Sequence, residues 1–465
     1  MVFSSLEFIF LFLPAFMAVY ALTPKKLKNA AIFLGSVIFY SFGIGDQTIY
    51  VYIFLMTILV NFIIGQFIGA YRKKKGRLWL VIGIIFNFWW LVFFKYSGFL
   101  LTNLNSFTGS SFTVKDIILP IGISFYTFQN VSYIIDVYRG DAKPEKNFIN
   151  YGAYITMFPQ LIAGPIVKYK TVAEQLKSRT HSAKRVEEGL KTFTIGLGYK
   201  VLLANRLGGL WTEINNIGFS SISPRLAWMG IFAYSFQLYF DFCGYSKMAI
   251  GLGCIMGFDI PQNFDNPYMS TTMGEFWRRW HMTLGSWFRE YIYIPLGGNR
   301  VSKGKVVRNY LAVWLFTGIW HGASWNFVIW GLVLFALIML EKFAIGDVLT
   351  KIRPLGHLYM IMVIPITWLL FAVTDFHQLG VYFSRLIPFF TKSTVVVNSE
   401  DYIKYWGIYG KFFVAGLFFS TTIPGKIYKK MKNSVFTSFV LLAVFWASVY
   451  CMYMGMNDPF MYFRF

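Results

Sequence analysis

Residues 309–340 read NYLAVWLFTGIWHGASWNFVIWGLVLFALIML, and this stretch is almost continuously apolar. An apolar run of this length is long enough to enter a lipid bilayer. It contains no Lys, Arg, Asp or Glu and one histidine, His321, near its middle. Ionisable groups at membrane depth are rare and commonly functional, so His321 is the first candidate site residue.

The composition of the whole chain indicates the same environment. Hydrophobic residues make up 56% of the 465 and charged residues 14%, whereas globular domains carry about 25% charged residues. The net charge is +22, but Lys and Arg gather in short runs between apolar segments, such as 73–75 and 429–430. That pattern is typical of cytoplasmic loops beside an anionic leaflet. The sequence therefore predicts a protein that contacts membrane lipids and binds no nucleic acid.

The apolar segments predict an all-α polytopic membrane protein with about ten or eleven transmembrane helices. The basic loops at 25–28 and 72–77 are expected on the cytoplasmic side, which places the N-terminus outside. No internal repeat or linker is evident, so residues 1–465 are expected to form one domain. The expected spans are 6–22, 29–44, 48–70, 78–100, 116–137, 192–210, 226–243, 357–375, 405–423 and 434–453.

Other segments do not fit simple spans. Residues 148–167, 244–258 and 309–340 are expected to be re-entrant, unless one span has been miscounted. Non-helical backbone at membrane depth is tolerated only where protein buries it or a cavity hydrates it, so these segments predict a central funnel. Residues 259–308 are basic and rich in Trp, and they are expected to form amphipathic interfacial helices.

His321 has the chemistry of a general base. A neutral imidazole can take a proton from a substrate hydroxyl or thiol near neutral pH. Gly318 and Gly322 would let a substrate or another backbone approach closely. The alternative is a structural histidine hydrogen-bonded between helices, and position alone does not decide between the two.

A second histidine, His281, lies in the run Phe-Trp-Arg-Arg-Trp-His at 276–281. On a continuous helix it would share a face with Trp277, and the two arginines could bind phosphates or lipid head groups. Locally, an interfacial helix with Trp anchors is the favoured alternative. The histidines and carboxylates lack the spacing of a metal site.

The last residues, 458–465, read DPFMYFRF. Tyr462 could carry an acyl group, because a phenolic oxygen can act as a covalent nucleophile. The alternative is an aromatic anchor at the membrane interface.

Five blocks in order resemble the membrane-bound O-acyltransferase (MBOAT) family, in its bacterial cell-surface branch. The resemblance runs through most of the chain. The blocks are 119–129 with 136–139, 158–166, 240–246, 277–281 and 320–322.

This resemblance implies an enzyme that moves an acyl group from a cytoplasmic thioester to a hydroxyl on the outer side. The family's catalytic histidine falls on His321, and its second histidine falls on His281, which would line the donor-side entrance or assist. The run 289–300 is similar to alginate and peptidoglycan O-acetyltransferases, whereas the related teichoic-acid D-alanylation proteins usually lack its Gly-Gly-Asn-Arg turn. The similarity favours acetyl-CoA as donor, without a bound cofactor or metal. The expected donor-binding residues are Arg278, Arg279, Asn299 and Arg300.

The resemblance also implies partners and a location. An acetyl group would pass to Tyr462 or to a partner's serine, and an extracytoplasmic acetyltransferase would then acetylate a cell-surface polysaccharide. The ending 460–463 is similar to the terminal motif of a small partner in D-alanylation systems. The expected location is the bacterial cytoplasmic membrane. The alternatives are D-alanyl transfer to teichoic acids, a non-enzymatic transporter of the acyl donor, and a scaffold for the outer acetyltransferase.

Overall fold

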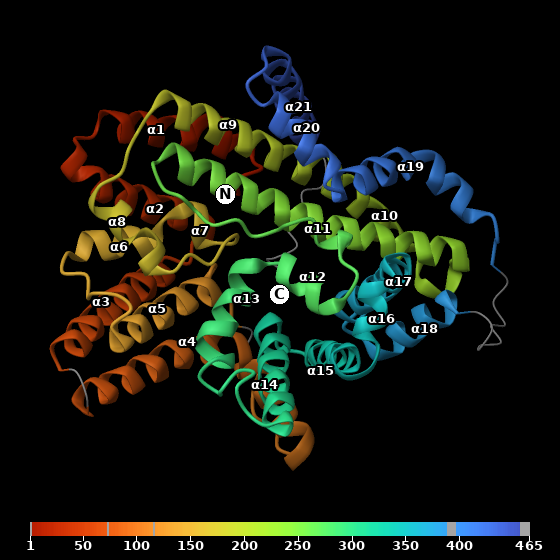
Figure 1. Cartoon of the computed structure of the whole chain (residues 1–465), viewed down its shortest axis with the longest axis horizontal. Coiled ribbons are helices and arrows are strands. Elements are labelled where there is room, and N and C mark those ends of the chain that lie inside the picture. Colours follow the sequence, from red (N-terminus) through yellow and green to blue (C-terminus); the bar gives the residue numbers. More distant parts are fainter. Residues whose placement is uncertain (1, 72–73, 115–116, 388–396, 456–465) are drawn as a thin grey trace. The chain divides into compact units, whose positions relative to one another are not determined.

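The computed structural model describes residues 2–71, 74–114, 117–387 and 397–455. Within these ranges the chain is helical and contains no β-strand (Figure 1). The chain divides into two compact units: a first unit of Met1–Phe193 with Ser246–Gln262, and a second unit of Thr194–Tyr245 with Asn263–Phe465. The all-helical fold class is confirmed, and the single domain over the whole chain stays a prediction.

The first unit confirms the predicted apolar helices near the N-terminus. The helix predicted at 116–137 starts later, at Ile123, because Gly122 before it has φ 75°. A Cβ at Gly122 would meet the carbonyl oxygen of Leu161, so only glycine fits this turn. The helices are η1 (Phe8–Phe12), α1 (Leu13–Leu22), η2 (Lys25–Leu27), α2 (Lys28–Ile44), α3 (Ile49–Ala70), α4 (Lys74–Thr108), α5 (Ile123–Arg139), α6 (Phe148–Thr156), α7 (Phe158–Leu161) and α8 (Tyr169–Lys177).

The predicted break at 148–167 is present. Helix α6 ends at Thr156, α7 forms one turn, and the chain then continues without regular structure. Residues 151–169 are all buried, and Tyr154 Oη donates to the carbonyl of Val167 at 2.9 Å. The broken backbone is therefore covered by protein, as the physics of a bilayer requires. Its path through a membrane stays a prediction.

The second unit contains most of the remaining helices. Two helices belong partly to each unit, α9 (Ala183–Gly198) and α11 (Pro224–Ile255). Those of the second unit are η3 (Tyr199–Ala204), α10 (Asn205–Ile217), η4 (Phe219–Ser221), η5 (Pro267–Met269), α12 (Met273–Arg279), α13 (Met282–Phe288), η6 (Arg289–Tyr293), α14 (Lys303–His321), α15 (Trp325–Leu340), η7 (Glu341–Ile345), α16 (Gly346–Lys351), α17 (Arg353–Ala372), α18 (Phe376–Leu386), α19 (Asp401–Ser420), α20 (Ile423–Met431) and α21 (Val435–Tyr453).

Helix α11 corrects one prediction. Residues 226–243 and 244–258 were expected to be a span and a separate re-entrant segment, but α11 runs unbroken to Ile255. Its glycines serve close packing rather than a turn. A Cβ at Gly251 would lie 2.5 Å from the carbonyl oxygen of Gly189, and one at Gly244 would lie 2.7 Å from that of Gly196. Small residues let helix backbones approach in this way.

Six helices among the described residues are long and apolar enough to cross a bilayer. Helix α21 is one of them, and large apolar side chains such as Phe439 and Trp446 are exposed along it. A helix that is apolar all round in this way suits lipid rather than water. The chain is a multi-pass membrane protein, whereas the count of about ten or eleven spans and the outside N-terminus stay predictions. The six helices are Lys25–Ile44, Ile49–Ala70, Lys75–Thr108, Trp325–Lys351, Arg353–Ala372 and Val435–Tyr453.

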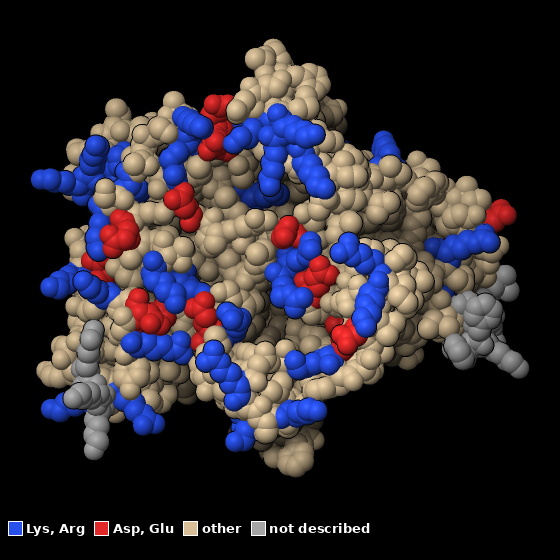
Figure 2. Space-filling model, viewed as in Figure 1, with Lys and Arg blue, Asp and Glu red and all other residues tan. Residues whose placement is uncertain are grey.

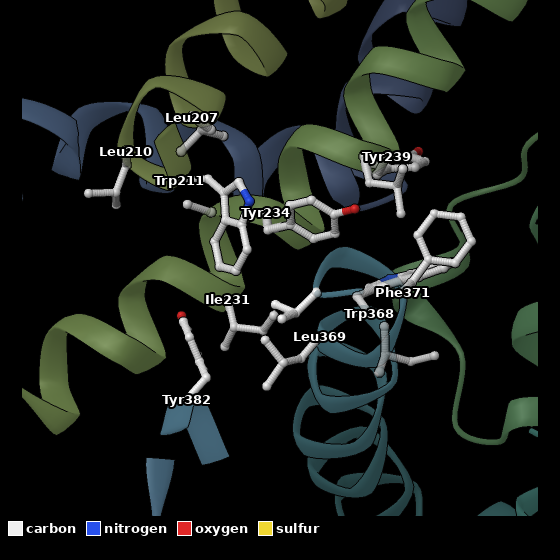
Figure 3. Close-up of a cluster of buried hydrophobic side chains, with 14 of the residues drawn as sticks. Leu207, Leu210, Trp211, Ile231, Tyr234, Tyr239, Trp368, Leu369, Phe371 and Tyr382 are labelled. Atoms are coloured by element: carbon white, nitrogen blue, oxygen red, sulfur yellow. The ribbon is translucent and has the colours of Figure 1, made fainter. Parts of the chain in front are cut away.

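An aromatic and aliphatic core holds the second unit together. Figure 3 shows side chains from α10, α11, α17 and α18 pointing toward one another. Trp211 and Tyr234 place their ring centroids 5.0 Å apart, and Trp368 of α17 is 2% exposed. This core fixes α17, which contributes Trp368 and Phe371 to the surroundings of the candidate site.

Helices α14 and α15 form a hairpin at 309–340, with His321 as the last residue of α14, and its expected re-entrant path stays a prediction. Two glycines allow the close approach. A Cβ at Gly331 would lie 2.5 Å from the carbonyl oxygen of Trp314, and a Cβ at Gly318 would meet the carbonyl oxygen of Phe327. The approach expected at Gly318 is therefore that of another backbone.

Gly318→Ala should destabilise this hairpin. The new methyl group would meet backbone, which cannot rotate away, so we expect a loss of about 1–3 kcal/mol and a lower Tm in detergent. Gly304→Ala is the matched control, because Gly304 is also in α14 and has no atom within 4 Å of its Cβ position. A Gly318→Ala protein as stable as the control would contradict the close contact.

Candidate active site

The two candidate histidines line one cavity in the second unit. The cavity has a volume of about 520 Å³ and is bordered by residues of α12, α13, η6, α14 and α15. His281 lies at the junction of α12 and α13, whereas His321 is the last residue of α14. The fold therefore brings together the two residues that the sequence singled out separately.

His321 is half-buried among aromatic rings. Its ring centroid lies 4.9 Å from that of Trp320, 5.1 Å from Trp330 and 5.3 Å from Phe371. The Trp330 and Phe371 rings meet it edge to face, at 83° and 81°. These rings hold the imidazole at the end of α14, beside the cavity, where it can exchange a proton with a bound molecule.

The run 276–281 does not form the continuous helix on which Trp277 and His281 would share a face. Helix α12 ends at Arg279, Trp280 is extended, and His281 has φ 43° before α13 begins. A left-handed conformation is uncommon for a residue other than glycine. Hydrogen bonds hold it here: the amide of Met282 donates to the carbonyl of Asn263 at 2.9 Å. Because the helix breaks, Trp277 and His281 do not share a helical face.

The aromatic side chains beside this break are core residues rather than interfacial anchors. Trp280 is 5% exposed and Trp287 is 2% exposed. Trp280 packs on Trp368 with ring centroids 5.0 Å apart, and Trp277 packs on Trp314 at 5.1 Å. The segment predicted to lie at the membrane surface thus contributes Trp277 and Trp280 to the wall of the cavity.

His281 is buried, with 3% of its surface exposed. Its Nδ1 lies 3.0 Å from Oδ1 of Asn263. Burial lowers the pKa of His281 to about 3, so the imidazole is neutral at physiological pH. A neutral ring can accept or donate a hydrogen bond but brings no positive charge to the cavity.

The four predicted donor-binding residues divide into two pairs. Arg278 and Asn299 line the cavity, and Asn299 accepts a hydrogen bond from Tyr293 at 2.6 Å. Arg279 instead pairs with Glu275 at 2.8 Å, and neither Arg279 nor the exposed Arg300 borders the cavity. Figure 2 shows Lys and Arg side chains, with a few acidic ones, over the region where Figure 1 places α12.

Sequence reasoning missed one arginine. Arg289 lines the same cavity as Arg278. It begins η6, a π-helix, and π-helical turns occur frequently at functional sites. In the sequence, only the position of Arg289 at the start of the block 289–300 pointed to a role. Helical periodicity gave no signal, because the extra residue of a π-turn shifts the spacing.

The N-terminus of α12 is fixed by a carboxylate from a distant helix. Glu341 accepts from the amides of Met273 at 2.6 Å and Gly274 at 3.1 Å. The hydroxyl of Thr272 accepts from the amide of Glu275 at 3.1 Å. These bonds satisfy orphan amide groups and hold α12, and with it Arg278, in one orientation.

Two further expectations concern Tyr462 and metals. Tyr462 lies outside the described residues. In the ranges that the structure describes, no group of three or more His, Cys, Asp or Glu side chains is arranged to hold a metal ion.

Comparison with known proteins assigns the family. The sequence profile of the membrane-bound O-acyltransferase family matches residues 145–351, which include every residue that lines the cavity. The chain is 40% identical to the probable alginate O-acetylase AlgI of Azotobacter vinelandii over 382 residues, 81% of this chain and 76% of that protein. The chain belongs to the membrane-bound O-acyltransferase family. It is therefore an O-acyltransferase, as the ordered blocks predicted.

Other relatives in the family act on different cell-surface polymers, according to their names. The chain is 37% identical to a peptidoglycan O-acetyltransferase of Helicobacter pylori over 72% of this chain and 69% of that protein. It is 32% identical to a teichoic acid D-alanyltransferase of Streptococcus thermophilus, over 46% of this chain and 54% of that protein. The similarity to the O-acetylating relatives thus extends over more of the chain.

His281→Asn should reduce the loss of stability on acidification. The His281 pKa is about 3 in the folded protein, whereas an unfolded histidine has a pKa of about 6.5. Between these values the unfolded chain binds one more proton, so the free energy of unfolding falls as pH falls, by about 1.4 kcal/mol per pH unit from this group.

Thermal unfolding in detergent from about pH 6.5 to about pH 4.5 measures this effect. We expect a steeper decline for the wild type than for His281→Asn. His377→Asn, which changes an exposed histidine, should keep the wild-type slope. Equal slopes for the wild type and His281→Asn would show that His281 is not buried in its neutral form.

Proposed function

We propose that this enzyme transfers acetyl groups from acetyl-CoA in the cytoplasm to a hydroxyl acceptor at the outer side, for O-acetylation of a cell-surface polysaccharide. The observation that carries the proposal is the single cavity shared by His281, His321 and two arginines. The relatives named as alginate O-acetylase and peptidoglycan O-acetyltransferase support acetyl as the transferred group. The cavity would be the meeting point of donor and acceptor inside the membrane.

In this mechanism His321 acts as the general base. It takes the proton from the acceptor hydroxyl as the oxygen attacks the carbonyl carbon of the thioester. The tetrahedral intermediate then collapses, the carbon–sulfur bond breaks, and the leaving thiolate receives the proton from His321. An ester and a free thiol are formed, and the imidazole returns to its neutral state.

In this mechanism, the acceptor hydroxyl and the partner protein are reached from the outer side of the membrane. The acceptor hydroxyl belongs to Tyr462 or to a serine of an extracytoplasmic acetyltransferase, which then acetylates the polysaccharide. Tyr462→Phe distinguishes the two, because only a Tyr462 relay requires the phenolic oxygen. This arrangement moves the acetyl group across the bacterial cytoplasmic membrane without moving its carrier.

The arginines would recognise the phosphates of acetyl-CoA. Guanidinium groups bind phosphates with paired hydrogen bonds. Arg278 and Arg289 border the cavity, and Arg278 also acts electrostatically on the Glu341 carboxylate. Arg279 is engaged by Glu275 and Arg300 lies away from the cavity, so the first pair is the stronger candidate.

His321→Ala should abolish transfer while the protein still accumulates in the membrane. Loss of a general base lowers the rate by about 10²- to 10⁴-fold. The measurement is release of CoA from acetyl-CoA by the purified enzyme, together with the O-acetyl content of surface polysaccharide in cells. His377→Ala is the control. Wild-type O-acetylation with a stably expressed His321→Ala protein would remove His321 from the mechanism.

The same assay separates the rival functions. If the protein were a transporter of the acyl donor, even the wild-type protein would leave acetyl-CoA intact. A D-alanyl transferase would use a D-alanyl carrier-protein thioester in preference to acetyl-CoA. A scaffold would support O-acetylation without His321.

Arg278→Ala and Arg289→Ala should each raise the KM for acetyl-CoA by about tenfold or more, because hydrogen bonds to charged groups contribute about 1.5–3 kcal/mol. S-acetylpantetheine, which has no phosphates, should show the same KM with the wild type and with both variants. Arg300→Ala should leave the KM for acetyl-CoA unchanged. This donor site would be contradicted if Arg300→Ala raised the KM for acetyl-CoA while Arg278→Ala and Arg289→Ala left it unchanged.

A further inference from the structure

Asn263 is a buried side chain that meets three groups at a single atom. It is 1% exposed. Its Oδ1 lies 3.0 Å from Nδ1 of His281, 3.3 Å from the amide nitrogen of Thr283 and 2.9 Å from the Thr283 hydroxyl. The Thr283 amide can only donate, so the atom that faces it is the carbonyl oxygen of Asn263 and not its NH₂ group.

This contact decides the protonation of His281. Because Oδ1 of Asn263 can only accept, Nδ1 of His281 must donate and therefore carries the hydrogen. A neutral imidazole carries one N–H, so Nε2 is left with a lone pair. Nε2 is buried and has no hydrogen-bond partner in the described part of the structure. A buried polar atom without a partner needs an explanation, and here the ring lines the cavity.

We infer that Asn263 is a positioning residue that fixes His281 as a hydrogen-bond acceptor for the substrate, and that Nε2 binds an O–H or N–H group. The inference rests on the proposed function for the identity of the substrates. A ligand carbonyl, a phosphate or a tetrahedral oxyanion offers no hydrogen and is a poor partner for this nitrogen. Two groups have the required chemistry: the acceptor's hydroxyl and an amide of the pantetheine arm of the donor.

The two histidines then have different tasks. His321, half-buried among aromatic rings, exchanges the proton, whereas His281 is neutral and orients a group that donates to it. Replacement of Asn263 would allow the His281 ring to take the other tautomer or to rotate. Transfer should then fall by about 10- to 100-fold, the loss found when the partner that orients a metal-ligating histidine is removed.

The first test reads the tautomer directly and needs no substrate. The full-length protein is labelled with ¹⁵N-histidine, and the His281 signals are identified by their absence in His281→Gln. We expect the Nδ1–H tautomer in the wild type and in Asn263→Asp, which keeps an acceptor oxygen. Asn263→Leu should lose the Nδ1–H tautomer of His281. An Nε2–H tautomer in the wild type would overturn the inference.

Thr283→Val is the matched control for this test. It removes one hydrogen bond to the same Asn263 oxygen and leaves the His281 bond in place. We expect Thr283→Val to keep the Nδ1–H tautomer and most of the activity. Loss of both in Thr283→Val, to the degree seen in Asn263→Leu, would mean that the network is only structural.

The second test identifies the bound group with two donors, S-acetylpantetheine and an S-acetyl alkanethiol that has no amide. If the amide binds Nε2, Asn263→Leu raises KM for S-acetylpantetheine alone. If the acceptor hydroxyl binds Nε2, Asn263→Leu lowers kcat equally with both donors and leaves their KM unchanged. Asn263→Asp should restore most of the rate.

Unchanged kinetics of Asn263→Leu with both donors would overturn the substrate-binding role. Failure of the proposed function looks different, because the wild type would then release no thiol from either donor. The tautomer measurement would still stand in that case, since it requires no turnover.

Discussion

The close contact between the backbones of α14 and α15 is the constraint on which the site depends. Gly318 and Gly331 leave no room for a side chain between the two helices. Lipid gives helices no hydrophobic reason to pair, so such contacts are a main source of stability in membranes. This contact holds the end of α14 in place, and His321 is the last residue of α14. Trp330 and Phe371 then pack against the imidazole, so hairpin packing and proton chemistry are directly linked.

The part of the cavity wall around His281 depends on hydrogen bonds rather than on close packing. His281 has a left-handed backbone, which costs energy and is held by its neighbours. Asn263 accepts hydrogen bonds from the amide of Met282, directly after His281, and from the His281 ring. Glu341 fixes the amides that begin α12, which carries Arg278. Two imidazoles thus meet one cavity in different environments, and different environments are how enzymes give like groups unlike roles.

Much of this fold follows from the sequence, because apolar length predicts helices in a bilayer. The helices matching most expected spans, the hairpin at 309–340 and the irregular segment within 148–167 were predicted, whereas the re-entrant path of these two segments stays a prediction. The continuity of α11 was not, because a glycine-rich run suits close helix packing as well as a turn. The break at His281 was also missed, since residue spacing cannot reveal a left-handed backbone held by a distant Asn263. Arg289 was missed as a cavity residue because a π-turn shifts the helical spacing.

We place the donor chemistry between His281 and His321 in one cavity. A structure of the enzyme with a stable thioether analogue of acetyl-CoA tests it most directly. We expect the analogue's acyl carbon beside His321, its phosphates near Arg278 and Arg289, and an N–H of the analogue or an acceptor hydroxyl at Nε2 of His281. An analogue bound elsewhere, with the cavity between the histidines unoccupied at saturating concentration, would rule out this cavity as the donor site.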